Sequence, residues 1–446
     1  MKVDLQQFFS KKDVEKLARA CGFVERKSPI TGFKFLLTFT TGLLNTPDGT
    51  LAQLVAFLSA ACKTEVSPQA VDERIEIAAM AFMRCCLDRA LAMVKRPRKF
   101  GCCAIADFDH VYIIDSTSFG IHPSLKDVFK GSSGSGSLAS MRIQLVMDYI
   151  TGVFYVQIGD TTLCDAPTLQ RIVENQKLDV SGKCLFLSDL GYFKTATFKS
   201  MKENNLHFLS KLMFGVSLCD GKGIKLDLTT ILKKKPESFD MVVTIDGQTY
   251  RLVGAMLSDA AVNQRLRKAN RKAQKKHGGA VTDAYRIFAR YAIFLTSLPK
   301  IYGMKTLYKL YRIRWQIELI FKTWKSIISI HKIRSARTER LMCEVYGKLI
   351  LAAISSMIVA AAEVKQNILI VSLHRAMKHL RTIALHLATA IMQGGSFLNM
   401  FIEKQACEIA RLCRKHRQKN KPTIEILLQS HLPTKGQNVR LQTKLA

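Results

Sequence analysis

The stretch His110-Val-Tyr-Ile-Ile-Asp115 marks the point at which helical patterning gives way to β-strands along this chain. Its β-branched and aromatic side chains are typical of a strand that is at least half buried. An aspartate ends the apolar run, and Ser-Thr-Ser follows it. The stretch therefore predicts the first strand of a sheet, with a carboxylate where that strand ends.

Further strands and helices follow toward the C-terminus. The elements predicted there are strands at 142–149, 153–159, 183–189 and 207–212, with helices at 166–176 and from about residue 195. Strands that first pair locally and then alternate with helices indicate an α/β fold with a mixed sheet. The Gly- and Ser-rich segment 131–137 lacks the lysine and the following helix of a phosphate-binding loop, so we interpret it as a connection or a loop near the functional site.

Residues 216–292 interrupt this alternation, and we interpret them as an insertion before a strand at 293–298. The insertion contains two β-like segments, 241–247 and 249–257, and then a strongly basic stretch. Seven cations fall within twelve residues there: Arg265, Arg267, Lys268, Arg271, Lys272, Lys275 and Lys276. Charge runs are usually solvated helix faces, but this density favours contact with phosphates.

The two ends of the chain, residues 1–104 and 351–446, are predicted to be helical up to a polar tail near residue 434. One helix is expected at 51–62, and Ser67-Pro68 predicts the start of a second that runs to residue 91. This pair fits a DNA-reading helix-turn-helix, and a plain helical bundle fits equally well. The longest apolar run, Leu349–Ala362, is short for a bilayer, so we expect a buried helix and no membrane segment.

The composition points to a polyanionic partner. Among 446 residues there are 67 Lys and Arg against 35 Asp and Glu, a formal net charge of +32. Nucleic acid is the leading candidate partner, and a membrane surface is the second. The twelve cysteines include no C-x2-C pair and the chain starts with polar residues, so we expect reduced thiols in the cytoplasm. Cys407, Cys413 and His416 suggest zinc only weakly, because zinc sites normally use closer paired spacings.

Three acids are singled out by their positions: Asp115 and Asp189 after apolar runs, and Glu318 within a long helix from about residue 304. At about 100° per residue, Arg314, Glu318 and Lys325 fall within an arc of roughly 60° beside Tyr311, with Lys322 next to them. The adjoining arc is apolar and is formed by Leu310, Ile313, Ile317, Ile320, Phe321 and Trp324. A solvated salt-bridge stripe is the simpler interpretation, since Arg314 and Glu318 are an i,i+4 pair.

Three segments resemble the motifs of bacterial insertion-sequence transposases of the DDE class: Asp115-Ser-Thr, Asp189-Leu-Gly-Tyr-Phe, and the stretch from Tyr311 to Lys325. The last matches the pattern Y-x2-R-x3-E-x6-K through Tyr311, Arg314, Glu318 and Lys325. The resemblance covers about residues 105–350. It implies a ribonuclease-H-like core at 105–215 and 293–350, with the β-rich insertion at 216–292 and flanking helical regions.

The same resemblance implies the chemistry. Asp115, Asp189 and Glu318 are expected to hold two Mg2+ or Mn2+ ions, which suit hard carboxylate oxygens. Tyr311, Arg314 and Lys325 are expected to grip phosphates beside the cleavage point, with Lys322 next to them. In some relatives a Trp of the insertion stacks on a flipped base. The tryptophans here are Trp315 and Trp324, so Phe288, Tyr285 or Tyr291 would have to replace it.

The resulting expectation is a cut-and-paste transposase that acts on double-stranded DNA. By analogy it works as a homodimer that pairs two element ends, in the cytoplasm of a bacterium and associated with the nucleoid. The N-terminal region, 1–104, is expected to bind DNA. Two rivals stay open: a nuclease without strand transfer, and a catalytically inactive DNA-binding protein or inhibitor derived from such an enzyme.

Overall fold

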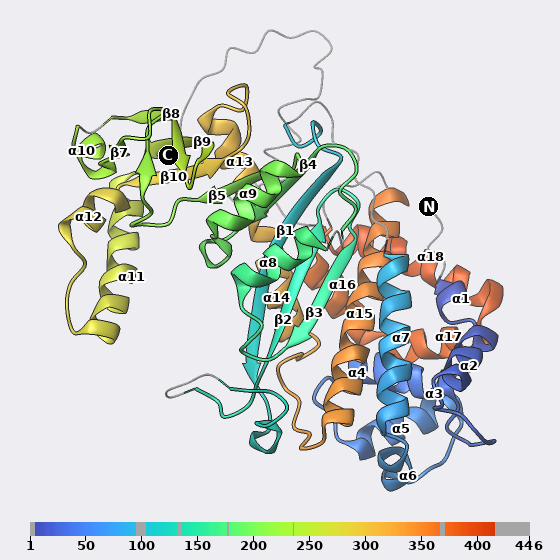
Figure 1. The fold of residues 1–446 in the computed structure, drawn as a ribbon. Coiled ribbons are helices and arrows are strands. Elements are labelled where there is room, and N and C mark those ends of the chain that lie inside the picture. Colours follow the sequence, from blue (N-terminus) through green and yellow to red (C-terminus); the bar gives the residue numbers. More distant parts are fainter. Residues whose placement is uncertain are drawn as a thin grey trace, which may run out of the picture.

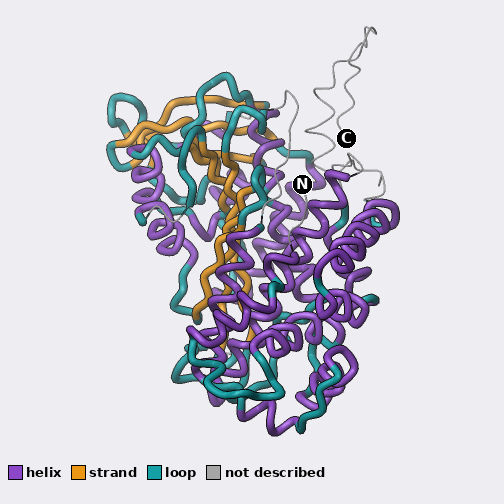
Figure 2. Tube along the Cα trace, turned by 90° about the vertical axis from the view of Figure 1, so that its right-hand side faces the viewer, coloured by secondary structure: helices purple, strands orange, loops and turns teal. Residues whose placement is uncertain are grey.

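The computed structural model describes residues 5–94, 104–131, 136–175, 178–234, 236–365 and 371–414. A twisted sheet runs through the middle of the molecule, and a body of helices lies beside it (Figure 1). A lobe extends from one end of the sheet and carries α10 (Leu228–Lys233), α11 (Asp259–His277) and α12 (Asp283–Ala289). The helices from the two ends of the chain lie together in the helical body (Figure 1), and Figure 2 shows helices packed along one side of the strands.

The predicted mixed sheet is confirmed. In the described ranges it has ten strands, in the order β3-β2-β1-β4-β5-β10-β9-β8-β6-β7. The first three strands are antiparallel neighbours, β4 and β5 continue the sheet in parallel, and β10 returns antiparallel to β5. The strands are β1 (His110–Gly120), β2 (Ser140–Asp148), β3 (Phe154–Gly159), β4 (Cys184–Ser188), β5 (His207–Lys211), β6 (Leu218–Cys219), β7 (Lys225–Leu226), β8 (Ser238–Ile245), β9 (Gln248–Met256) and β10 (Tyr291–Thr296).

The first strand is longer than predicted. We expected it to end at Asp115, but β1 continues to Gly120, so Asp115 lies within the strand. The reason is that β1 has two neighbours of unequal length. Its parallel pairing with β4 ends at the pair Ile113–Leu187, whereas its antiparallel pairing with β2 continues to Gly120. Extending the parallel register by two residues places Asp115 level with Asp189, the residue directly after β4.

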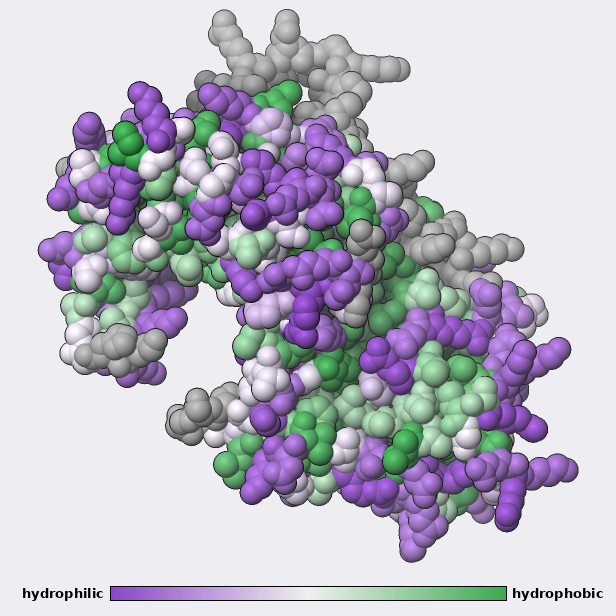
Figure 3. All heavy atoms as spheres, viewed as in Figure 1, coloured by the Kyte–Doolittle hydropathy of each residue, from purple (hydrophilic) through white to green (hydrophobic). Residues whose placement is uncertain are grey.

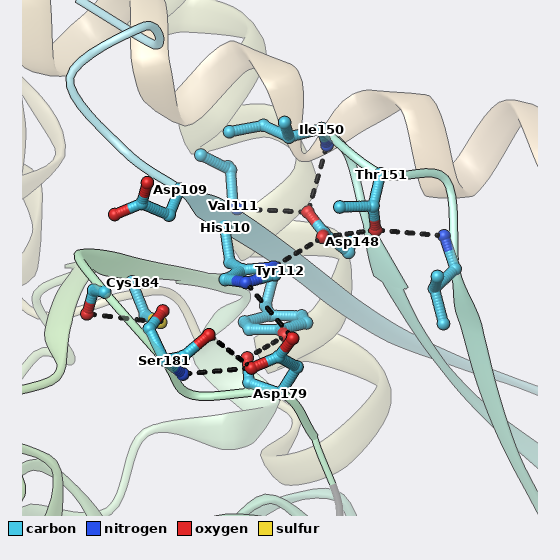
Figure 4. Close-up of polar contacts among 12 residues, drawn as sticks. Asp109, His110, Val111, Tyr112, Asp148, Ile150, Thr151, Asp179, Ser181 and Cys184 are labelled. Carbon is cyan, nitrogen blue, oxygen red and sulfur yellow. Dashed lines mark hydrogen bonds and ion pairs between the residues drawn. The ribbon is translucent and has the colours of Figure 1, made fainter. Parts of the chain in front are cut away.

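A polar cluster holds the first residues of β1 (Figure 4). Nδ1 of His110 lies 2.8 Å from a carboxylate oxygen of Asp148, at the end of β2. The same carboxylate accepts hydrogen bonds from the backbone N–H groups of Val111 and Ile150. On the other side of the ring, Nε2 of His110 lies 3.6 Å from the carboxylate of Asp179. The cluster ties β1 to its hairpin partner and to the loop before β4, and so sets the register on which the position of Asp115 depends.

Side chains of β1 alternate between two hydrophobic clusters, as the period of a strand requires. Val111 and Ile113 pack in the cluster shared with the helical body, and Tyr112 and Ile114 pack in the cluster on the opposite face. The second face is covered by α8 (Asp165–Glu174) and α9 (Thr195–Glu203). The first face is covered by α13 (Met304–Ile313) and α14 (Trp315–Ser326), together with the helical body.

The helical body is built around α15 (Thr338–Lys365), which packs against helices from both ends of the chain. By length and composition its residues Thr338–Val364 form one helix that is able to cross a membrane, but 94% of the apolar window is buried inside the protein. The prediction of a buried helix at 349–362 is confirmed. The other members of the body are α1 (Leu5–Phe8), α2 (Lys11–Ala20), α3 (Gly32–Leu37), the π-helix Thr38–Gly42, α4 (Leu43–Asn45), α5 (Leu51–Cys62), α6 (Pro68–Glu73), α7 (Ile77–Met93), α16 (Leu373–Thr382), α17 (Ala384–Gln393) and α18 (Gly395–Leu412).

The helix predicted from Ser67 begins there, and the Ser67 hydroxyl caps its first turn by accepting a hydrogen bond from the N–H of Ala70. The prediction of one continuous helix to residue 91 is wrong, because the chain breaks into α6 and α7. Ile75 lies in the break and is fully buried, and its carbonyl oxygen accepts a hydrogen bond from Arg337 at 2.7 Å. Burying this side chain and pairing its carbonyl with a residue distant in sequence favours the break over a continued helix.

Candidate active site

The three singled-out acids come from three elements that meet on one side of the sheet. Asp115 lies in β1, Asp189 directly follows β4, and Glu318 lies in the first turn of α14. Asp189 and Glu318 both raise the pKa of Asp115 electrostatically, which requires that the three carboxylates lie near one another. The structure therefore brings the three acids together.

The single long helix predicted from residue 304 is interrupted at Arg314, which separates α13 from α14. Arg314 keeps helical backbone angles, with φ at −49° and ψ at −34°, so the helical spacing of side chains carries through the interruption. The predicted apolar stripe is confirmed, since all six of its members are buried: Leu310, Ile313, Ile317, Ile320, Phe321 and Trp324. That stripe turns the neighbouring stripe of polar residues toward Asp115 within β1 and toward the end of β4.

Arg314 lies between two of the acids. Its guanidinium donates a hydrogen bond to Glu318 at 2.8 Å, and another of its nitrogens lies 3.5 Å from a carboxylate oxygen of Asp115. The arginine side chain is 11% exposed, against 22% for Asp115 and 27% for Glu318. The predicted i,i+4 ion pair therefore exists, but it is partly buried and includes an acid from the sheet, unlike a solvated stripe.

Tyr311 reaches the third acid. Its hydroxyl donates to the carbonyl oxygen of Ser188 at 3.2 Å and lies 3.5 Å from the carboxylate of Asp189. The ring packs against Phe294 of β10, and the amine of Lys211 lies 5.4 Å from the ring centre. Burial raises the pKa of the Tyr311 hydroxyl, so the group is a neutral donor at physiological pH.

The electrostatics of the site reflect its burial. Burial raises the pKa of Asp115 to about 6, against the opposing effects of the Ser116 N–H and of Arg314. Burial also lowers the pKa of Lys211, which Asp189 partly offsets. Burial acts to lower the pKa of Arg314 as well, but the Tyr311 hydroxyl and the carboxylates outweigh it and the net shift is upward. Burial thus disfavours the charged forms of Asp115 and Lys211, whereas the charge of Arg314 is favoured by its neighbours.

A hydrogen-bonded network supports the segments that carry the two aspartates. The hydroxyl of Ser116 and the side-chain amide of Gln144 both donate to Asp165, at 2.8 Å and 2.7 Å. The hydroxyl of Tyr192, which belongs to the motif after Asp189, donates to the amide oxygen of Gln144. Gln144 and Asp165 had not been predicted to belong to the site. Only Gln144, a polar residue inside an apolar strand, carried a signal in the sequence.

A cavity of about 500 Å3 adjoins the acids and shares Tyr311 and Arg314 with them. Besides those two, its lining includes Lys211, Arg265, Tyr308, Arg312 and Trp315. Trp315 is 45% exposed and Tyr308 is 44% exposed, so aromatic faces and cations both line the space. The sequence had not identified Lys211, Tyr308 or Arg312, because strands and helices distant in sequence bring them together.

The residues predicted to contact DNA differ in their surroundings. Arg267, Lys268, Arg271 and Lys272 are exposed on α11, and Lys268, Arg271, Lys272 and Lys275 line a groove along it. Arg265 instead donates hydrogen bonds to the backbone carbonyls of Tyr291 and Ala289. Lys322 is exposed with its amine 4.5 Å from the Trp315 ring centre, and Lys325 is half-buried. An open hollow separates the lobe with α11 from the rest of the molecule (Figure 3).

Two of the aromatic residues considered for base stacking are core residues, because Phe288 and Tyr291 are buried. Tyr285 is half-buried and packs on Phe214. Of the zinc candidates, Cys407 and Cys413 lie in the helical body, and His416 lies outside the described residues, as do residues 132–135 of the Gly- and Ser-rich loop. Within the described ranges, His, Cys, Asp and Glu side chains form no group that is ready to hold a metal ion, and this includes the three acids as they stand.

Comparisons with known proteins agree on one family. The family profile described as "Transposase DDE domain" matches residues 107–354, more than half of the chain. The transposase for insertion sequence element IS231B of Bacillus thuringiensis subsp. berliner is 26% identical over 368 residues, covering 77% of this chain and 76% of that protein. The transposase for insertion sequence element IS1151 of Clostridium perfringens is 28% identical over 389 residues, covering 80% and 79%.

Proposed function

The chain belongs to the family of transposases with a DDE domain, and from this premise we propose that it cleaves DNA at the ends of a mobile element and joins the freed ends to target DNA. The observation that carries the proposal is the meeting of Asp115, Asp189 and Glu318 around the side chains of Arg314 and Tyr311. In the proposal these three side chains are the metal-binding acids of the family, and they come from separate elements.

The donor set fits Mg2+ or Mn2+. Asp115, Asp189 and Glu318 offer hard carboxylate oxygens, which these ions prefer. In the proposal these three side chains would hold two ions. When bound, two such ions supply Lewis-acid stabilisation of the attacking and leaving oxygens of an in-line displacement at phosphorus.

The side chains around the acids have distinct proposed tasks. Arg314 donates two hydrogen bonds to a phosphate beside the cleavage point, and Lys325 and Lys322 add positive charges along the same helix. Tyr311 holds the end of β4, which positions Asp189. The exposed cations of α11 contact the DNA backbone farther from the cleavage point. The hollow between the lobe and the body, visible in Figure 3, leaves room for DNA to approach.

Further parts of the proposal concern the assembly. We take the parallel and antiparallel strands β1–β5 and β10 as a ribonuclease-H-like core, 216–292 as its insertion, and 1–104 as a DNA-binding region. A homodimer pairs two element ends on double-stranded DNA in the bacterial cytoplasm, at the nucleoid. Trp315 and Tyr308, exposed aromatic residues in the cavity that Arg314 also lines, take the place of the insertion Trp of some relatives.

The test uses the full chain and a labelled duplex that carries the element's own terminal repeat, with Mg2+ or Mn2+. Nicking at the repeat boundary is expected from the wild type and from Glu203→Gln, a matched change on the exposed face of α9. Glu318→Gln is expected to bind the duplex without nicking it. Nicking without joining to added target DNA would favour the nuclease rival. Tight, salt-sensitive binding without nicking under either metal would favour the inactive DNA-binding rival.

A further inference from the structure

Arg314 contacts two of the three side chains that would hold the proposed metal ions. Its guanidinium contacts Glu318 at 2.8 Å and approaches Asp115 to 3.5 Å, so a fixed positive charge lies between two of the three proposed ligands. A like charge at such range opposes the entry of a divalent cation, more strongly where burial reduces screening. Consistent with this, the three acids do not form a ready metal site among the described residues.

The contacts of Arg314 with the two carboxylates neutralise its charge but use only part of its hydrogen-bonding capacity. A guanidinium carries five N–H donors. In the described structure, Nε and Nη1 of Arg314 are buried without a hydrogen-bond partner, and the direct hydrogen bond to Glu318 comes from Nη2. A phosphate accepts two parallel hydrogen bonds from such a group, which the present contacts do not supply. Arg314 therefore has unused capacity for a phosphate ligand.

The same side chain borders an open space. Arg314 lines the cavity of about 500 Å3 together with Lys211, Arg312 and Trp315. Those cations and the exposed Trp face suit a nucleic-acid strand, whose phosphates and bases have the complementary chemistry. Because Arg314 lines this cavity, a phosphate bound there would lie within reach of the guanidinium.

We propose that Arg314 neutralises Asp115 and Glu318 while the protein is free of DNA, and that a DNA phosphate in the adjoining cavity draws the guanidinium away, so that divalent ions bind together with DNA. This inference rests on the proposed function for the identity of the phosphate. Removing Arg314 from the carboxylates and adding the ions are then coupled steps, and by linkage DNA and metal each raise the affinity for the other. Because of this coupling, the metal ions bind weakly until a DNA strand occupies the adjoining cavity.

Isothermal titration calorimetry of Mn2+ into the full chain without DNA tests the proposal. Arg314→Gln is expected to bind Mn2+ about tenfold more tightly than the wild type, within the usual range of coupling between two sites. Arg312→Gln, which removes an exposed cation from the same cavity, is expected to bind Mn2+ as the wild type does. The double change Arg314→Gln with Glu318→Gln is expected to lose the gained affinity, which locates the ion at the acids.

A second titration adds a short duplex with the terminal repeat, using Ca2+ so that the DNA stays intact. The duplex is expected to raise the wild-type affinity for Ca2+ several-fold, and to raise that of Arg314→Gln much less. Equal or weaker Mn2+ binding by Arg314→Gln, in protein whose circular dichroism matches the wild type, would overturn the proposal. If Arg314→Gln does not fold, Arg314→Lys replaces it in the test. Its shorter, unforked amine is expected to give a smaller increase in Mn2+ affinity, and no increase would overturn the proposal.

These readouts do not depend on cutting. Tighter Mn2+ binding by Arg314→Gln in a chain that never nicks DNA would support the role of Arg314 while contradicting the proposed transposase activity. Nicking by the wild type with unchanged metal affinity in Arg314→Gln would contradict the role of Arg314 alone.

Discussion

The hydroxyl of Tyr311 lies 3.5 Å from the carboxylate of Asp189, at the point where the chain leaves β4. The same hydroxyl donates to the carbonyl oxygen of the preceding Ser188 at 3.2 Å. A residue of α13 therefore holds the end of a strand that carries a proposed metal ligand. This contact joins the helix of the third motif to the strand of the second.

Tyr311→Phe keeps the ring packed on Phe294 and removes only the hydroxyl. The loss of one hydrogen bond loosens Asp189, so we expect the cleavage rate at saturating DNA to fall roughly 3- to 10-fold. DNA affinity and its salt dependence are expected to stay as in the wild type, because no charge is removed. Single-turnover cleavage and filter binding measure the two effects. An unchanged rate with weakened DNA binding would show that Tyr311 contacts DNA instead of positioning Asp189.

Arg251 of β9 fastens the lobe strands to the segment that follows β10. Its guanidinium pairs with Asp240 through two nitrogens and donates to the carbonyls of Pro299 and Tyr302, at 2.8 Å and 2.9 Å. Arg251→Met leaves these acceptors unpaired, so we expect the free energy of unfolding to fall by roughly 2–4 kcal/mol. Urea denaturation measures it, with the exposed Arg267→Met as control. A loss no larger than that of the control would contradict this role.

The exposed cations of α11 are predicted to act as a group on DNA phosphates. Replacing Lys268, Arg271 and Lys272 by Gln removes three charges that line one groove. The slope of log affinity against log salt is expected to become shallower by about 3, for specific and unrelated duplexes alike. Arg286 on the neighbouring α12 already pairs with Asp283, so Arg286→Gln is expected to leave the slope unchanged. An unaltered slope in the triple variant would place DNA elsewhere.

Lys348 is a fully buried lysine in α15, and its amine donates to the carbonyl oxygen of Ser329 at 3.0 Å. Burial lowers its pKa to about 8, although Glu344 and Asp48 act in the opposite direction. Because the folded-state pKa lies below the unfolded one, the unfolded chain binds more protons between these values, and stability rises with pH across that window. Relative to Lys348→Met, the wild type is expected to gain about 2 kcal/mol between pH 8 and pH 10.

Urea denaturation of both proteins at pH 7, 8, 9 and 10 checks this prediction. Most other pH effects act on both proteins and cancel in the difference. A difference that stays constant with pH would mean that Lys348 has the same pKa in the folded and unfolded states.

Sequence periodicity was sufficient to predict the mixed sheet and the apolar stripe of α13 and α14, because both depend on the local alternation of side chains. It was insufficient to predict where strands and helices end. Asp115 lies inside β1 because β2 outlasts β4 as a neighbour, and the break at Ile75 depends on Arg337, far along the chain. Neither contact is visible in a local pattern.

The candidate site divides in the same way. Motif spacing singled out Asp115, Asp189 and Glu318, and the fold brings them together. The placement of Arg314 between two acids depends on how α14 packs against β1, which spacing alone does not specify. Lys211 and Tyr308 come from elements nearly a hundred residues apart in the sequence, so only the tertiary structure reveals the cavity that they line.

The most direct test of the account asks whether Asp189 contacts a metal ion during cleavage. Asp189→Cys replaces a carboxylate by a thiolate, which binds Mn2+ better than Mg2+. We predict that cleavage of the terminal-repeat duplex by this variant is lost in Mg2+ and partly restored in Mn2+, whereas the exposed Asp127→Cys cuts in both. Equal activity of Asp189→Cys in the two metals, or no cleavage in either by folded protein that binds the duplex, would contradict the assignment of Asp189 as a metal ligand.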